Sequence, residues 1–168
     1  MRRVMLLLAA MALSLVVLGG IAYSQDERPP KTILYKGERE LQMGRLGSYC
    51  WFDPSSGDGQ CRDVAKLTYP AADDVGAGSV LRIRILEERK PDKFSVLAYR
   101  EIDERGFPAG KTRQLDTSLR RVVEDGQTVA WDVSFRVNVP GRLYYLDASG
   151  IWEDAGDAGW NFHVKTRG

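Results

Sequence analysis

The chain has 168 residues, of which 43% are hydrophobic and 28% are charged, and its 24 basic and 23 acidic side chains give a formal net charge of +1. This length suits one domain with a single core once a leader is set aside. Because the charges are mixed along the chain and almost cancel, the basic patch that nucleic-acid binding needs is missing, and we expect no nucleic-acid partner.

The N-terminus has the parts of an export signal. Residues 1–3 contain two arginines, Val4–Leu18 is an almost unbroken apolar run, and Ala22–Ser24 has the small residues typical of a signal-peptidase site. The alternative is an uncleaved anchor, because Val4–Tyr23 is long enough to cross about 30 Å of hydrocarbon. In both cases the arginines stay in the cytoplasm. We therefore expect a protein that is secreted or anchored to the outer face of the cytoplasmic membrane, with membrane contact only through an uncleaved N-terminal segment.

The sequence divides into three parts. Residues 1–24 are the signal peptide or signal anchor, residues 25–40 are an extended leader and linker, and residues 41–168 are expected to form the folded domain. The segment Asp26–Lys31 is polar and contains two adjacent prolines, as spacers that hold a domain away from a membrane often do.

Short runs with alternating hydrophobicity follow, separated by turns rich in Gly, Pro and Asp. In Val129–Val139 every second residue is large and apolar, a period that excludes a helix, and Val80–Leu86 alternates in the same way. The other expected strands are Thr32–Tyr35, Leu41–Trp51, Cys61–Tyr69, Phe94–Ile102, Arg142–Ala148 and Trp160–Lys165. No window shows a sustained helical stripe, so the pattern predicts an all-β antiparallel sandwich of about seven to nine strands.

The two cysteines, Cys50 and Cys61, have ten residues between them. In an oxidising compartment such a pair predicts a disulfide that closes a local loop and stabilises the fold by roughly 2–3 kcal/mol. A zinc site would need further ligands nearby, and the one histidine of the chain, His163, is far along the sequence. A redox pair more often has only two residues between its cysteines.

The C-terminal third resembles a known class of domain. Pro140-Gly141 leads into the tyrosine-bearing run Arg142–Leu146, followed by Ile151-Trp152 and then Gly159–Val164. This ending resembles the last two strands of immunoglobulin-like and fibronectin-like modules, and Leu46–Trp51 with Cys61 is similar to a motif of uncharacterised exported bacterial proteins. The resemblance implies an immunoglobulin-like sandwich. The local cysteine pair differs from the widely spaced pair of antibody domains, so the same bridge between sheets is not implied.

Several residues have side chains of types that can carry chemistry. His163 is expected to face solvent on the last strand beside Asn161 and Lys165, without a partner for acid–base work. The loop Asp53–Gly59, with Asp63 beyond it, and the pair Asp73-Asp74 offer oxygen ligands for calcium, although turns use the same residue types.

The cluster Glu101, Asp103 and Glu104 could in principle supply the two carboxylates of a glycoside hydrolase, although such acids are also common as solubilising charges. No residue is predicted as catalytic, metal-binding or cofactor-binding, and no cofactor is expected.

The leading hypothesis is a non-enzymatic, extracytoplasmic module that contacts a protein or envelope component through its loops. Trp51 and Trp152 are expected to be surface aromatics. The residues of the predicted contact region are Trp51, Phe52, Asp53, Asp58 and Trp152. The alternatives are an exported hydrolase that uses carboxylates, and an inhibitor or chaperone that works through an exposed edge strand.

Overall fold

A computed structural model describes residues 28–138 and 142–167 of the chain. The predicted signal or anchor at residues 1–24 lies outside this range. The described residues form two β-sheets and contain no helix, which confirms the all-β prediction and is consistent with a β-sandwich.

The first sheet has five strands, and every neighbouring pair in it is antiparallel. In spatial order its strands are β2 (Arg39–Met43), β1 (Thr32–Lys36), β6 (Val80–Ile85), β10 (Gln127–Arg136) and β9 (Ser118–Glu124). The strand β1 lies inside this sheet and its Leu34 is fully buried, so the sandwich includes residues that the sequence division assigned to the leader.

The second sheet has seven strands. In spatial order they are β4 (Gly59–Arg62), β3 (Arg45–Phe52), β12 (Gly156–Arg167), β11 (Leu143–Trp152), β7 (Lys93–Tyr99) and β8 (Arg113–Gln114), while β5 (Asp73–Gly76) pairs in parallel with the end of β12. The described residues thus form twelve strands, more than expected, because short strands were added at the edges.

The core lies between the sheets and follows the period-two pattern. Leu81, Ile83 and Ile85 of β6 are fully buried, and they belong to the same core cluster as Leu146 and Ala148 of β11 in the other sheet. Other large members of this cluster that are fully or almost fully buried include Leu34, Val75, Val96, Val133, Phe135, Val137, Trp152, Trp160, Phe162 and Val164. Removal of these side chains from water is the main stabilising term of such a sandwich.

The expected strand Leu41–Trp51 is instead two strands in different sheets. The chain leaves β2 at Gly44 and enters β3, and a Cβ atom at Gly44 would lie 2.3 Å from Thr32 Oγ1 and 2.8 Å from the Phe162 ring. Only glycine fits where the chain passes between the sheets. Nearby, the buried Gln42 amide accepts a bond from the His163 N–H (2.8 Å) and donates to its carbonyl (2.9 Å), which ties β2 to β12.

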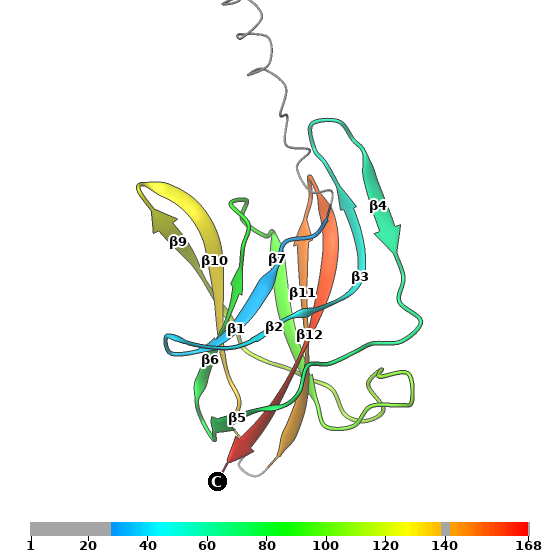
Figure 1. Ribbon diagram of the computed structural model, residues 1–168, viewed down its shortest axis with the longest axis vertical. Coiled ribbons are helices and arrows are strands. Elements are labelled where there is room, and N and C mark those ends of the chain that lie inside the picture. Colours follow the sequence, from blue (N-terminus) through cyan, green and yellow to red (C-terminus); the bar gives the residue numbers. More distant parts are fainter. Residues whose placement is uncertain (1–27, 139–141, 168) are drawn as a thin grey trace, which may run out of the picture.

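The path of the chain brings several loops together at one end of the sandwich (Figure 1). The chain crosses between sheets from β6 to β7 and from β10 to β11, and it forms hairpins from β9 to β10 and from β11 to β12. The β9–β10 turn is Asp125-Gly126, with φ values of 50° and 80°, as a tight two-residue hairpin requires. The β6–β7, β9–β10, β11–β12 and β3–β4 connections all lie at the same end, at the top of Figure 1.

Two leucines of β11 test this packing directly. Leu146 is fully buried, whereas Leu143 is 42% exposed. We expect Leu146→Ala to lower the free energy of unfolding by about 2–5 kcal/mol, because it leaves a cavity, and Leu143→Ala to change it by less than about 0.5 kcal/mol. Urea denaturation measures both. Equal losses would mean that the two strand faces are assigned wrongly.

Candidate functional site

The candidate site is the loop end, defined by four connections. These are residues 53–58 between β3 and β4, 86–92 between β6 and β7, 125–126 between β9 and β10, and 153–155 between β11 and β12. Arg28, the first described residue, lines a cleft at this same end. Loops presented by a rigid sandwich are a common location for binding sites.

Trp51 and Trp152 form the floor beneath these loops. They are only 4% and 1% exposed, and their ring centroids lie 5.1 Å apart at 78°. The prediction that they are surface aromatics is therefore wrong. Strand β11 continues beyond Ala148 to Trp152, so the inward alternation places the indole of Trp152 in the core, and the same alternation in β3 buries Trp51 after Tyr49.

Two indole N–H groups hold the β6–β7 loop in place. Trp131 Nε1 donates to the Glu88 carbonyl and Trp152 Nε1 donates to the Arg89 carbonyl, each at 3.1 Å. The same loop is tied to the β11–β12 connection, since the Asp92 carboxylate accepts from the Glu153 N–H at 2.8 Å. Neighbouring loops are thus fixed to the core and to one another.

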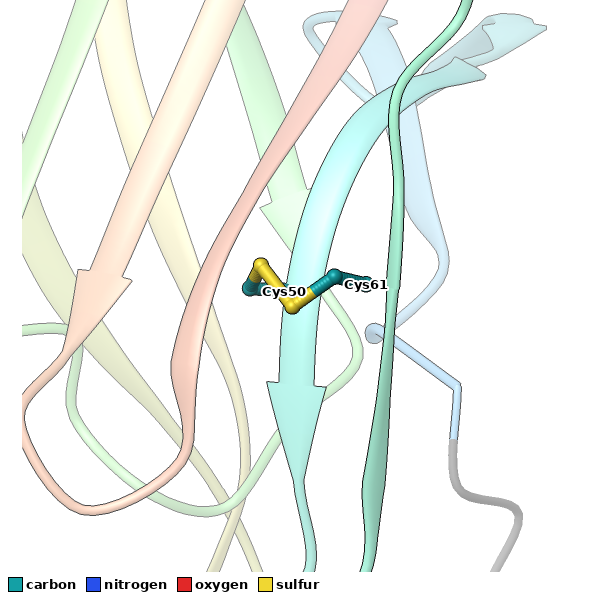
Figure 2. Close-up of a disulfide and its surroundings, with 2 residues drawn as sticks. All are labelled: Cys50 and Cys61. Carbon is teal, nitrogen blue, oxygen red and sulfur yellow. A yellow bond between two sulfur atoms is a disulfide. The ribbon is translucent and has the colours of Figure 1, made fainter.

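The predicted disulfide is confirmed and lies within the β3–β4 hairpin. Cys50 and Cys61 are directly opposite one another on the two strands, and the bridge joins them across the pair (Figure 2). Beyond the bridge, the Phe52 N–H donates to the Ala155 carbonyl at 2.9 Å, which attaches the hairpin to the β11–β12 connection. Gly156 permits this close approach: its φ is 104°, and a Cβ atom there would lie 2.0 Å from the Cys50 carbonyl oxygen.

Asp53 organises the tip of this hairpin. Its carboxylate accepts from the Ser55 N–H at 2.7 Å and from the Ser55 hydroxyl at 2.6 Å, and its own N–H donates to the Asp58 carbonyl at 2.7 Å. The hydrogen bonds from Ser55 lower the pKa of Asp53 below its usual value. Asp53 therefore shapes the turn. Within 28–138 and 142–167, no three His, Cys, Asp or Glu side chains are grouped as metal ligands.

A cleft of about 480 Å³ opens between this hairpin and the β6–β7 loop. Phe52, 39% exposed, and Asp53 line one side of it, and Leu86–Arg89 line the other. Arg89 is held on the floor: its guanidinium lies 5.4 Å from the Trp51 ring centroid and bonds both carboxylate oxygens of Glu87 at 3.0 and 3.2 Å. The loop end thus presents an exposed aromatic beside fixed charged groups.

Carboxylates predominate at the loop end. The four connections carry eight of them and only two cationic side chains, Arg89 and Lys90. The acidic residues are Asp53, Asp58, Glu87, Glu88, Asp92, Asp125, Glu153 and Asp154. A surface of this sign attracts a partner that carries cationic groups.

His163 lies on the outer face of its sheet, as predicted, but it is only partly exposed and has aromatic neighbours. Tyr145 stacks on it with ring centroids 4.4 Å apart, and the segment that follows β4 places Tyr69 over Tyr145 at 4.9 Å. Burial lowers the pKa of His163 and raises the pKa of Tyr69 to about 12. The expected strand Cys61–Tyr69 ends at Arg62, and the remaining segment covers this face instead.

The other acids considered from the sequence have separate structural roles. Asp103 accepts from the N–H groups of Arg105 (2.9 Å) and Phe107 (2.8 Å), so it caps its own turn, while Glu101 lines a different cleft. Asp73 accepts from the Gln42 amide at 2.7 Å, and Asp74 is bonded to Arg167. The structure therefore does not assemble these residues into one site.

The sequence analysis did not single out one buried carboxylate, Asp132. Asp132 has no exposed surface and is bonded by Arg82 (3.0 Å), Arg84 (2.8 Å) and Arg120 (3.2 Å). Burial alone would raise its pKa, but the bonds from Arg84 and its neighbours outweigh this and lower the pKa. The sequence around Asp132 does not indicate this arrangement, because Arg82, Arg84 and Arg120 lie on other strands.

Comparison with known proteins gives no assignment: no protein-family model matches the chain, and no curated protein matches it in sequence. In the part of the chain that the structure describes, no helix is long and apolar enough to cross a membrane.

The partly buried histidine predicts a specific pH dependence of stability. Well above the usual pKa of 6.5 the ring is neutral in both states, but as the pH falls toward this value the unfolded chain takes up a proton before the folded one, so stability falls. We expect His163→Phe, which can keep the stacking on Tyr145, to lose less stability than the wild type between about pH 7.5 and pH 5. Urea denaturation at the two pH values measures this difference, and identical losses would contradict the partial burial of His163.

Proposed function

We propose that this protein is a non-enzymatic, extracytoplasmic binding module whose contact surface is the loop end. The observation that carries the proposal is the joint fixation of three loops by two indole N–H bonds, a disulfide and the Phe52–Ala155 backbone bond. Loops that are ordered before binding lose less conformational freedom when a partner arrives. The exposed Phe52 beside the cleft supplies the kind of aromatic anchor that interfaces favour.

We also propose that the sandwich is immunoglobulin-like. The sheet order β1-β6-β10-β9 corresponds to strands A, B, E and D of that fold, and β7-β11-β12 corresponds to C, F and G. In this correspondence the β6–β7 and β11–β12 connections are the B–C and F–G loops, two of those that bind ligands in variable domains. The β3–β4 hairpin with its disulfide is then an addition at the G edge.

Localisation outside the cytoplasm is part of the proposal. The disulfide supports an oxidising environment, in which such bonds form and persist. The sequence of residues 1–24 supports export. The expected partner is an extracytoplasmic protein or envelope component, and the acidic character of the loop end favours one with a cationic surface.

The test exchanges the hairpin tip. Residues 52–59 are replaced by a neutral Gly/Ser linker that keeps both cysteines, and binding is measured by surface plasmon resonance to the partner recovered from an envelope extract. Surface loops tolerate such exchange, so folding is expected to survive. We expect affinity to fall at least about tenfold, or about 1.4 kcal/mol.

A matched pair of point variants separates the loop end from exposed apolar surface in general. Phe52 and Leu143 are 39% and 42% exposed, and Leu143 begins β11 at the end remote from Trp152. Phe52→Ser is expected to weaken binding, and Leu143→Ser to leave it unchanged. Unchanged binding after the exchange of residues 52–59 would reject the loop end as the contact surface and favour the exposed edge strand β9 instead.

A further inference from the structure

A second cleft, of about 560 Å³, lies at the opposite end of the sandwich from the loop end. The cleft opens where β7 ends and β11 begins. Strand β11 runs from Leu143, beside this cleft, to Trp152, beneath the loop end, so the two clefts lie at opposite ends of the sandwich. Its volume falls within the range of about 300–1,000 Å³ that small-molecule sites occupy.

Cationic side chains surround this cleft. Arg100, Lys111, Arg113 and Arg136 all line it, and the only carboxylate among its lining residues is Glu101. We call these four cations and the space between them the cationic cleft. None of the four forms an ion pair with any carboxylate of the described residues.

The cluster around Asp132 is a useful comparison, because its arginines are paired with a carboxylate. There, three guanidinium groups lie within 3.2 Å of one buried carboxylate, which compensates their charge. The cationic cleft has a similar number of cations, but no carboxylate of the described residues is bonded to them. Like charges that surround one concave, partly apolar space raise the local potential and attract an anion into it.

The wall of the cationic cleft is apolar. Leu115 and Tyr144 are each 8% exposed, Val137 is 2% exposed, and all three belong to the hydrophobic core. The guanidinium of Arg100 lies 5.7 Å from the centroid of the Tyr144 ring, which joins the charged rim to this wall. A ligand that fits both parts has a charged group for the rim and a hydrophobic body for the wall.

We propose that the cationic cleft binds a small amphipathic anion, namely a carboxylate, sulfonate or phosphate group attached to an aromatic or aliphatic body. This site is separate from the loop end and does not depend on the function proposed for it. Arginine suits such a ligand because its planar donors match the geometry of an oxyanion.

The experiment uses two probes that share a hydrophobic body and differ in charge. The first is 8-anilino-1-naphthalenesulfonate and the second is the uncharged N-phenyl-1-naphthylamine, and both report binding by fluorescence. The full chain is titrated as wild type and as the double variant Lys111→Gln/Arg113→Gln. The control is Arg62→Gln/Lys66→Gln, which removes one arginine and one lysine from exposed positions on and after β4.

We expect the sulfonate to bind the wild type and the control alike, and the Lys111→Gln/Arg113→Gln variant at least tenfold more weakly. Its affinity for the wild type should fall as the salt concentration rises from about 20 to 200 mM, because salt screens the charges. Any binding to the apolar run Val4–Leu18 is common to all three proteins and cancels in the comparison. The uncharged probe should bind all three proteins equally and more weakly than the sulfonate binds the wild type.

Three results would overturn the proposal: equal sulfonate affinity in all three proteins, an equal loss in the control, or an uncharged probe that binds the wild type as tightly as the sulfonate does. Thermal unfolding checks that each variant is folded. If the double variant has a lowered midpoint, Lys111→Gln alone is used, since it changes one exposed side chain and is still expected to weaken sulfonate binding.

Discussion

The hydrogen bonds from the indoles of Trp131 and Trp152 to the adjacent carbonyls of Glu88 and Arg89 are the constraint on which the loop end depends. Both rings pack on the core, so the residues that stabilise the sandwich also determine where the β6–β7 loop lies. The β11–β12 connection is then bonded to that loop, and the disulfide hairpin is bonded to the β11–β12 connection. The order of the loop end is therefore a consequence of core packing.

Charge is used differently in three parts of the molecule. On the outer face of the five-stranded sheet, Asp132 and its three arginines satisfy one another, and removal of the carboxylate would leave those cations without their partner. At the loop end carboxylates are in excess, and in the cationic cleft Arg100, Lys111, Arg113 and Arg136 are in excess. The first arrangement is structural, whereas the two unbalanced ones lie beside open clefts, and that is why our proposals concern them.

The sequence was sufficient for the strands whose two faces differ clearly, such as β6, where Leu81, Ile83 and Ile85 are buried as their alternation predicted, and for the disulfide, because both depend on local patterns. It was insufficient where a distant segment determines the environment. His163 was placed on the correct face, but its burial depends on the segment that carries Tyr69. The exposure of Trp152 was predicted wrongly because Gly150, which lies between Ala148 and Trp152 on the buried face of β11, has no side chain that would continue the apolar alternation. The need for glycine at positions 44 and 156 could not be predicted, because it arises from Phe162 and Cys50, which lie far away in the sequence.

The central claim is that the loop end is the surface through which this protein contacts its partner. The most direct measurement places a photo-crosslinking benzoylphenylalanine at position 52 or, in a second protein, at position 143, and irradiates intact cells that export each protein. These positions have nearly equal exposure and begin or end strands at opposite ends of the sandwich. The account predicts one discrete partner adduct from position 52 and none from position 143. An adduct from position 143 alone, equal adducts from both positions, or no adduct from position 52 would contradict it.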